Sequence, residues 1–122
     1  MPEAPGPETT QRLLEQKVVW IASVRPDQRP HLVPVWFVWH AGMFYFSTSP
    51  DSVKARNIAA NPRVTLALED GSNPVICEGE AQPVARSTEV ADAFFRKYEW
   101  NLDTEEHFHQ MYAVVPLRWI NW

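Results

Sequence analysis

The chain has 122 residues, which suits one domain with a sizeable core rather than two domains. Its formal net charge of −4 argues against nucleic acid as a partner, because binding a phosphate backbone needs clustered lysines and arginines. The single cysteine, Cys77, excludes an internal disulfide bond and a multi-cysteine zinc site. Six tryptophans, six phenylalanines and three tyrosines indicate a large buried interface or a ligand platform as well as a core.

The first residues are rich in proline, and we expect residues 1–7 to form a flexible tail ahead of a single domain over residues 8–122. The sequence shows no charged-then-apolar signal segment and no apolar run near the roughly 20 residues needed to span a bilayer. A cytoplasmic protein without a membrane partner is therefore expected.

The first elements are a short helix over Glu8–Gln16 and a buried strand over Lys17–Val24. The segment Pro26–Pro30 has turn chemistry, and His31–Trp39 is predicted as a strand that is apolar on both sides. A small barrel needs only one apolar face per strand, so the second face indicates contact with a ligand or another subunit.

Pro34 lies inside this apolar strand, although proline cannot donate to a sheet ladder. Two interpretations are open: an edge or bulge position, or a backbone freed to approach a ligand ring. His31, Trp36 and Phe37 lie on the same segment and could line a pocket. For Trp36 and Phe37, a place in the core or in a subunit interface is an equal alternative.

A hairpin at His40–Gly42 leads into a strand over Met43–Thr48. Ser49, Pro50 and Asp51 supply N-cap residues and an early proline for a helix that continues to about Ala60. The unpaired N–H groups of that helix start and the hydroxyls of Ser47, Thr48 and Ser49 make a natural anion pocket.

Three residues of this helix are candidates for a phosphate. Lys54 and Asn57 are three residues apart and share a face, whereas Lys54 and Arg56 point about 200° apart. Lys54 is therefore the first choice and Arg56 the weaker one. The bland interpretation, a capped helix with a solvated basic face, remains open.

The second half alternates strands and helices. Strands are predicted over Arg63–Glu69, Val75–Ala85 with a possible bulge at Gly79, and Met111–Leu117. An amphipathic helix is predicted over Ser87–Tyr98, and Asp103 with Glu106 resembles a capping box for a short helix ending at His107 or Phe108. Six strands with helical connections in so short a chain predict a mainly β fold with short helices, a small closed or nearly closed barrel.

The usual catalytic patterns are missing from the sequence, and no catalytic residue is identified. His107 and His109 would diverge on a helix and lack a nearby third ligand, so no metal site is predicted. No nucleophile stands beside a His/Asp pair, and no paired carboxylates suggest hydrolysis. A cofactor that carries the chemistry would explain this pattern.

Two strings carry a resemblance to a known family: VVWIASVRPDQRPHLVPVWFVW at 18–39 and FYFSTSPDSVKARNIAANPRVTLALED at 44–70. They resemble the pyridoxamine 5′-phosphate oxidase-like superfamily of FMN-binding split barrels, and within it the small F-420-dependent oxidoreductases. The closing YAVVPLRWINW at 112–122 is similar to the C-terminal strand of that group.

This resemblance implies a six-stranded antiparallel split β-barrel that is homodimeric, with the cofactor site at the subunit interface. It implies FMN or the deazaflavin coenzyme F-420 as cofactor. By position, the phosphate would be held by the strand and helix-start residues Ser47, Thr48, Ser49, Lys54, Arg56 and Asn57. Pro34, Val35 and Trp36 occupy the segment that lines the ring. His31 falls where the true oxidases carry a phosphate-contacting arginine, which argues against the vitamin B6 oxidase activity itself.

The function expected first is hydride transfer between coenzyme F-420 and a small organic substrate. One alternative is an FMN-dependent oxidoreductase on the same barrel, and another is a non-catalytic binding protein for flavin, F-420 or haem. The substrate is not readable from the sequence. The C-terminal segment, with Arg118, Trp119 and Trp122, combines a cation with aromatic residues, and we expect it to reach the cofactor site of one subunit or the other. The alternative is that its tryptophans pack on the barrel's own surface.

Overall fold

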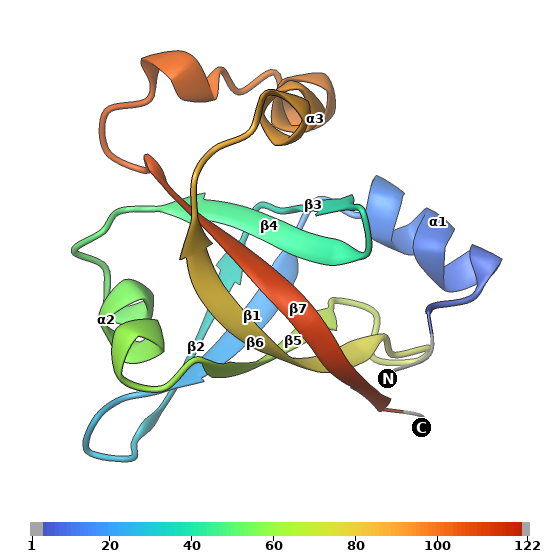
Figure 1. Ribbon diagram of the computed structural model, residues 1–122. Coiled ribbons are helices and arrows are strands. Elements are labelled where there is room, and N and C mark those ends of the chain that lie inside the picture. Colours follow the sequence, from blue (N-terminus) through green and yellow to red (C-terminus); the bar gives the residue numbers. More distant parts are fainter. Residues whose placement is uncertain (1–3, 121–122) are drawn as a thin grey trace.

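The computed structural model describes residues 4–120, which form one curled antiparallel sheet with helices packed on it (Figure 1). The helices are α1 (Pro7–Glu15), α2 (Val53–Ala60) and α3 (Thr88–Tyr98), with a 3₁₀ turn, η1, at Leu102–Thr104. The strands are β1 (Val19–Val24), β2 (Pro30–Val35), β3 (Val38–His40), β4 (Met43–Thr48), β5 (Arg63–Leu68), β6 (Ile76–Val84) and β7 (Gln110–Ile120).

The strand order across the sheet is β2-β1-β5-β6-β7-β4-β3, and all neighbours are antiparallel. The two edge strands, β2 and β3, are consecutive in the chain, so the sheet curls round until its two edges are joined by a single connection. This is the split barrel that the sequence predicted, with one correction. The predicted strand His31–Trp39 is broken at Trp36–Phe37, which raises the strand number from six to seven.

The break follows from the sheet pairing on each side of it. Val35 is the last residue of β2 paired with β1, whereas Val38 is already paired with β4. Pro30 and Pro34 both lie on β2, and a strand with two prolines is confined to a sheet edge because proline has no N–H to donate. The edge interpretation of Pro34 is confirmed.

The core fills the inside of the curled sheet. Its largest buried side chains come from the inward faces of β1, β4, β5 and β7 and from the break, and include Ile21, Leu66, Phe44, Phe46 and Phe37. A second cluster lies under α3, where Val90 and Phe94 pack against Val38, Leu102 and Met111. Phe37 at the break belongs to the first cluster and the next residue, Val38, to the second, so the break is packed between the barrel and α3.

Gly79 marks the predicted bulge in β6, which is confirmed by a register shift between Glu78 and Gly79. A Cβ at Gly79 would lie 2.7 Å from Cγ1 of Val114 and 2.8 Å from the carbonyl oxygen of Val115. Glycine therefore permits the close approach of β6 and β7, the most extensively paired strands of the barrel.

Two helix starts differ from the prediction. The N-cap of α2 is Ser52, whose hydroxyl accepts a hydrogen bond from the Ala55 amide at 3.2 Å, so Ser49 is not the cap. Residues 103–108 do not form a capped helix. Asn101 caps the single turn η1 instead, by accepting from the Asp103 amide at 2.9 Å. At α2 the cap is the residue next to the first helical residue, and at η1 it precedes the turn that contains Asp103.

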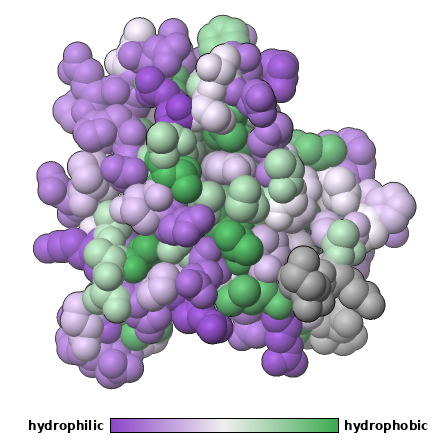
Figure 2. All heavy atoms as spheres, in the orientation of Figure 1, coloured by the Kyte–Doolittle hydropathy of each residue, from purple (hydrophilic) through white to green (hydrophobic). Residues whose placement is uncertain are grey.

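One face of the molecule shows hydrophobic residues gathered over its middle, where β6 and β7 run, with hydrophilic residues around the margin (Figure 2). Val115 and Leu117 of β7 are exposed on the outside of the sheet. Among residues 4–120, no helix is long and apolar enough to cross a membrane.

Candidate functional site

A cavity of about 390 Å³ opens at the split of the barrel, where β2 ends. Strand, helix and loop residues meet there: Pro34, Val35, Trp36, Ser47, Thr48, Lys54, Trp100, Glu105 and Phe108. The first six come from β2, the break, β4 and α2, and the last three come from the connection between α3 and β7. Residues far apart in the sequence, such as Pro34 and Phe108, therefore line one cavity, between the β2–β3 break and the end of β4.

One end of the cavity is cationic. Lys54 is the second residue of α2, and burial lowers the pKa of its ammonium group. The ammonium has no ion-pair partner among the described residues. Thr48 is buried and its hydroxyl donates to Ser52 Oγ at 3.4 Å, which continues into the cap of α2. This end can hold an anion.

His31 lies close enough to this cationic end to interact with it. Burial, and then the positive charges of Arg25 and Lys54, lower the pKa of His31. Its Nδ1 is buried and has no hydrogen-bond partner in the described structure. This buried nitrogen is therefore unsatisfied, although His31 itself does not line the cavity.

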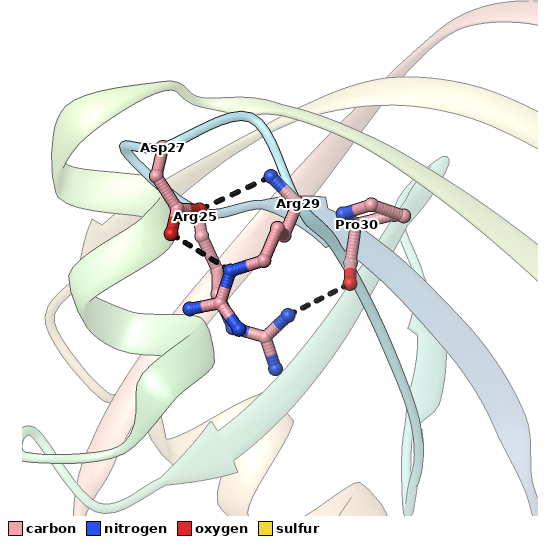
Figure 3. A network of polar contacts seen from close by, with 4 residues as sticks. All are labelled: Arg25, Asp27, Arg29 and Pro30. Atoms are coloured by element: carbon pink, nitrogen blue, oxygen red, sulfur yellow. Dashed lines mark hydrogen bonds and ion pairs between the residues drawn. The ribbon is translucent and has the colours of Figure 1, made fainter.

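Arg25 belongs to the β1–β2 hairpin, which the sequence identified only as a turn. Its guanidinium donates to the Pro30 carbonyl oxygen at 2.9 Å, and Arg29 forms a 2.7 Å ion pair with Asp27 in the same turn (Figure 3). The Arg29 amide also donates to Asp27 at 3.2 Å. These bonds fix the turn and hold the base of the Arg25 side chain next to β2.

Part of the cavity lining is aromatic. The Trp36 ring stacks on Tyr98, with centroids 4.7 Å apart and planes 4° apart, and meets Trp100 edge-on at 5.8 Å. Trp36 is nonetheless 50% exposed, as is Phe108. Exposed aromatic surface of this size beside a cavity suits a planar apolar group.

The connection between α3 and β7 is held in place by Glu105 and Ser47. One oxygen of Glu105 accepts from the Trp100 indole at 2.8 Å, and the other accepts from the amides of His107 and Phe108 at 3.0 and 3.2 Å. The Ser47 hydroxyl donates to the Phe108 carbonyl oxygen. Hydrogen bonds from the His107 amide, the Trp100 indole and the Phe108 amide lower the pKa of Glu105.

The cavity therefore gathers six of the twelve residues singled out in the sequence. His31, Ser49, Arg56 and Asn57 do not line it. Arg56 is exposed on the far side of α2, as the helical spacing predicted, and the Ser49 hydroxyl accepts from the Asp51 amide at 3.2 Å. Asn57 is 1% exposed and donates to Ser23 Oγ at 3.0 Å, a bond inside the core.

The C-terminal segment lies away from this cavity in the single chain. Trp119 packs on Trp39 and Phe44, with ring centroids 5.9 and 6.1 Å apart, and Arg118 lies 3.9 Å from Glu78. Whether the segment reaches a partner's site stays a prediction. Trp122 lies outside the described residues.

Sequence reasoning missed Trp100, Glu105, Phe108 and Arg25. The available signal was the pattern W-N-L-D-T-E-E-H-F-H at 100–109, where aromatic residues surround carboxylates between two regular elements. Within residues 4–120, no three His, Cys, Asp or Glu side chains are placed to hold a metal ion.

Comparisons with known proteins bear on this arrangement. The model of the family described as pyridoxamine 5′-phosphate oxidase matches residues 6–120. No curated protein sequence matches the chain. An F420 reductase superposes with a TM-score of 0.74 and 24% identity, over 94% of this chain and 98% of the other.

Two further solved structures share the fold. The haem storage protein HutZ from Vibrio cholerae superposes with a TM-score of 0.76 at 20% identity, over 91% of this chain and 89% of the other. The conserved hypothetical protein Rv2991 from Mycobacterium tuberculosis gives 0.77 at 21% identity, over 98% and 88%. At these identities the likeness concerns the fold alone.

Proposed function

The chain belongs to the pyridoxamine 5′-phosphate oxidase family, and on that premise we propose that it is an oxidoreductase working with coenzyme F-420 or FMN. The observation that carries the proposal is the polarity of one cavity. Lys54 and hydroxyl groups line the same cavity as exposed aromatic rings. A ring with a phosphate-bearing tail combines the same two kinds of group.

The residues at the cationic end fit a phosphate. Lys54 carries an unpaired charge among the described residues, and Ser47 and Thr48 contribute hydroxyl groups beside the start of α2. Lys54 would hold the charge, and Arg25 would add to the positive field from the hairpin. The Ser47 and Thr48 hydroxyls would donate to the phosphate in place of their present acceptors, the Phe108 carbonyl oxygen and Ser52 Oγ.

The residues at the aromatic end fit the ring. Pro34, Val35 and Trp36 present apolar surface at the strand end, and Phe108 faces the same space from the loop. The bound cofactor would supply hydride transfer, which no side chain can perform. The protein's part is to orient the ring against the substrate and to exclude water, so no acid–base residue is assigned.

The test is titration of the purified protein with F-420 and with FMN, followed by absorbance and by calorimetry. Binding of F-420 in preference to FMN, with reduction of an added quinone by reduced F-420, supports the first form of the proposal. A flavin spectrum in the purified protein supports the FMN form. Binding of neither cofactor at millimolar concentration refutes both.

The proposal includes a homodimer, because the edge of the barrel leaves apolar surface uncovered. Leu32 is 61% exposed on β2, and Val115 and Leu117 are exposed on β7. The two prolines of β2 hinder strand-to-strand pairing, so the subunits would join through their faces. A folded monomer at micromolar concentration in sedimentation velocity would refute the dimer.

Haem binding without turnover is the second candidate, and one observation favours it. His107 and His109 are both exposed and flank Phe108, which lines the cavity. Haem titration of the parent and of a His107→Ala/His109→Ala variant separates the two candidates. Loss of the haem Soret band only in the double variant, with F-420 and FMN both unbound, would favour haem.

A further inference from the structure

At the break between β2 and β3, backbone groups lose their sheet hydrogen bonds, and side chains from another part of the chain replace them. Where the strand ladder stops, the N–H and C=O groups of Phe37 lose their sheet partners, and Phe37 is fully buried. Buried peptide groups need replacement partners, because leaving them unpaired costs free energy. Both replacements come from the C-terminal end of α3, about 60 residues away.

The Tyr98 hydroxyl bonds to both the amide and the carbonyl oxygen of Phe37. The Phe37 amide donates to the Tyr98 hydroxyl oxygen at 2.9 Å, and that hydroxyl lies 2.7 Å from the Phe37 carbonyl oxygen and 2.8 Å from that of Lys17. Burial raises the pKa of Tyr98 to about 12, so the hydroxyl keeps its proton at neutral pH and remains a donor.

The neighbouring Lys97 adds a further hydrogen bond to the Phe37 carbonyl oxygen. Its ammonium donates to the Phe37 carbonyl oxygen at 3.0 Å and to that of Leu13 at 3.4 Å, and it lies 4.0 Å from the centre of the Phe37 ring. Two consecutive residues of α3 therefore hold the break.

The same tyrosine also contacts the aromatic wall of the cavity. Trp36 directly precedes Phe37, and its ring lies parallel to that of Tyr98 at 4.7 Å. One Trp36 face is thus supported from behind, while the residue stays half-exposed and lines the cavity. Tyr98 itself does not line the cavity, so its influence on a ligand passes through Trp36.

We propose that Tyr98 is a positioning residue for ligand binding: by bonding Phe37 and stacking on Trp36, it sets the angle at which Trp36 faces the cavity. The inference rests on the proposed function in one respect, that a planar ring binds against Trp36. Its structural part, the dependence of Trp36 on the Tyr98 hydroxyl, can be tested without any ligand.

The variant is Tyr98→Phe, which removes the hydroxyl and keeps a ring for stacking. The matched control is Tyr112→Phe, because Tyr112 is also buried and stacks on Phe46, yet its hydroxyl makes no hydrogen bond within the described structure. The first readout is the indole N–H resonance of Trp36, assigned by its loss in Trp36→Phe. We expect this resonance to shift or broaden in Tyr98→Phe and to stay in place in Tyr112→Phe.

The second readout is affinity, measured with FMN and with inorganic phosphate as probes. Tyr98→Phe is expected to weaken FMN binding by about fivefold to tenfold, the range of one lost hydrogen bond, and to leave phosphate binding unchanged. In a Trp36→Ala background the same change should have no further effect on FMN, because the ring it positions is gone.

Two results would overturn the proposal: a Trp36 resonance that is identical in parent and Tyr98→Phe, or an equal loss of FMN affinity with and without Trp36. Neither depends on turnover. If the parent binds neither FMN nor F-420, the proposed function fails, and the resonance alone decides the positioning role.

Discussion

The cavity has two walls that are held in different ways. The strand–helix wall, formed by Pro34, Val35, Thr48 and Lys54, belongs to regular elements whose backbone groups bond to one another. The loop wall, formed by Trp100, Glu105 and Phe108, depends on side chains that bond to backbone, mainly those of Glu105 and Ser47. A change in the first wall should thus alter a contact, whereas a change in the second should alter the shape of the cavity.

The largest effect is expected in the strand–helix wall. Lys54→Ala removes a half-buried ammonium that has no other partner among the described residues. A charge-assisted hydrogen bond of this kind contributes about 1.5–3 kcal/mol, so the affinity for F-420 or FMN should fall by roughly tenfold to a hundredfold. Calorimetric titration measures the loss.

Arg56→Ala is the matched control for Lys54→Ala, since it removes a cation from the exposed side of the same helix. It should change affinity far less, and neither variant should lower the melting temperature much. If Arg56→Ala lost affinity while Lys54→Ala bound like the parent, the assignment of the cationic end would be wrong.

The two walls also differ in how far the sequence predicts them. Hydrophobic alternation and turn residues place Met43–Thr48 as a strand, and helical spacing turns Lys54 and Arg56 apart, as the structure confirms. Both patterns are local, and together they bring Ser47 near Lys54. Ser49 was expected as the cap, but Ser52 lies closer to the first helical residues and makes the bond.

The strand break has no local pattern, and the loop wall offers only aromatic residues around carboxylates at 100–109. His31–Trp39 is apolar throughout, and nothing in it marks Phe37 as the residue that leaves the ladder. The decisive partners are Tyr98 and Lys97, whose role depends on where α3 packs. The role of Glu105 could not be predicted either, because its bonds to Trp100 and Phe108 exist only once the loop is folded.

The next effect tests the loop wall. Glu105→Ala removes the acceptor for the Trp100 indole and for two amides, so the loop should loosen and Phe108 should leave its place. We expect affinity for the same cofactor to fall by about threefold to tenfold, within the range of one or two net hydrogen bonds. Limited proteolysis should show faster cleavage within residues 100–109.

The control for Glu105→Ala is Glu106→Ala, an exposed neighbour that removes the same charge. It should leave both the affinity and the cleavage rate at the parent's values. Equal effects in the two variants would mean that net charge, rather than the bonds of Glu105, governs the loop.

Protonation should affect the two walls at opposite ends of the pH scale, beginning with Lys97 behind the strand–helix wall. Burial, with the nearby charge of Lys17, lowers the pKa of Lys97 to about 8 from 10.5. Between these values the unfolded chain binds more protons than the folded one, so stability should rise with pH from 8 to 10.5. Because Lys97 is partly solvated, the gain should be about 1 kcal/mol.

Urea unfolding across this pH range measures the gain, and the comparison is with Lys97→Met, which keeps the aliphatic stem. The variant should lose this part of the pH dependence. The uncharged amine of the parent still has two hydrogens for the carbonyl oxygens of Phe37 and Leu13, so deprotonation should not open the break. An identical slope in the variant would exclude Lys97 as the source.

The smallest effect is expected for the loop wall in acid. Hydrogen bonds from the His107 and Phe108 amides and the Trp100 indole hold the pKa of Glu105 below its ordinary value of 4.5. A lowered pKa means that the ionised carboxylate stabilises the folded loop above pH 4.5, and that this contribution disappears as the pH falls through the lowered pKa. Hydrogen exchange should therefore show that the amides of His107 and Phe108 lose protection only at the acid end, relative to β4 amides under the same conditions.

The control variant Glu105→Gln cannot ionise, so the protection of these amides should be weaker at neutral pH and should not change with pH across the same range. If the parent's loop amides lost protection in parallel with those of β4, the whole barrel would be opening in acid, and the two walls would not be independent.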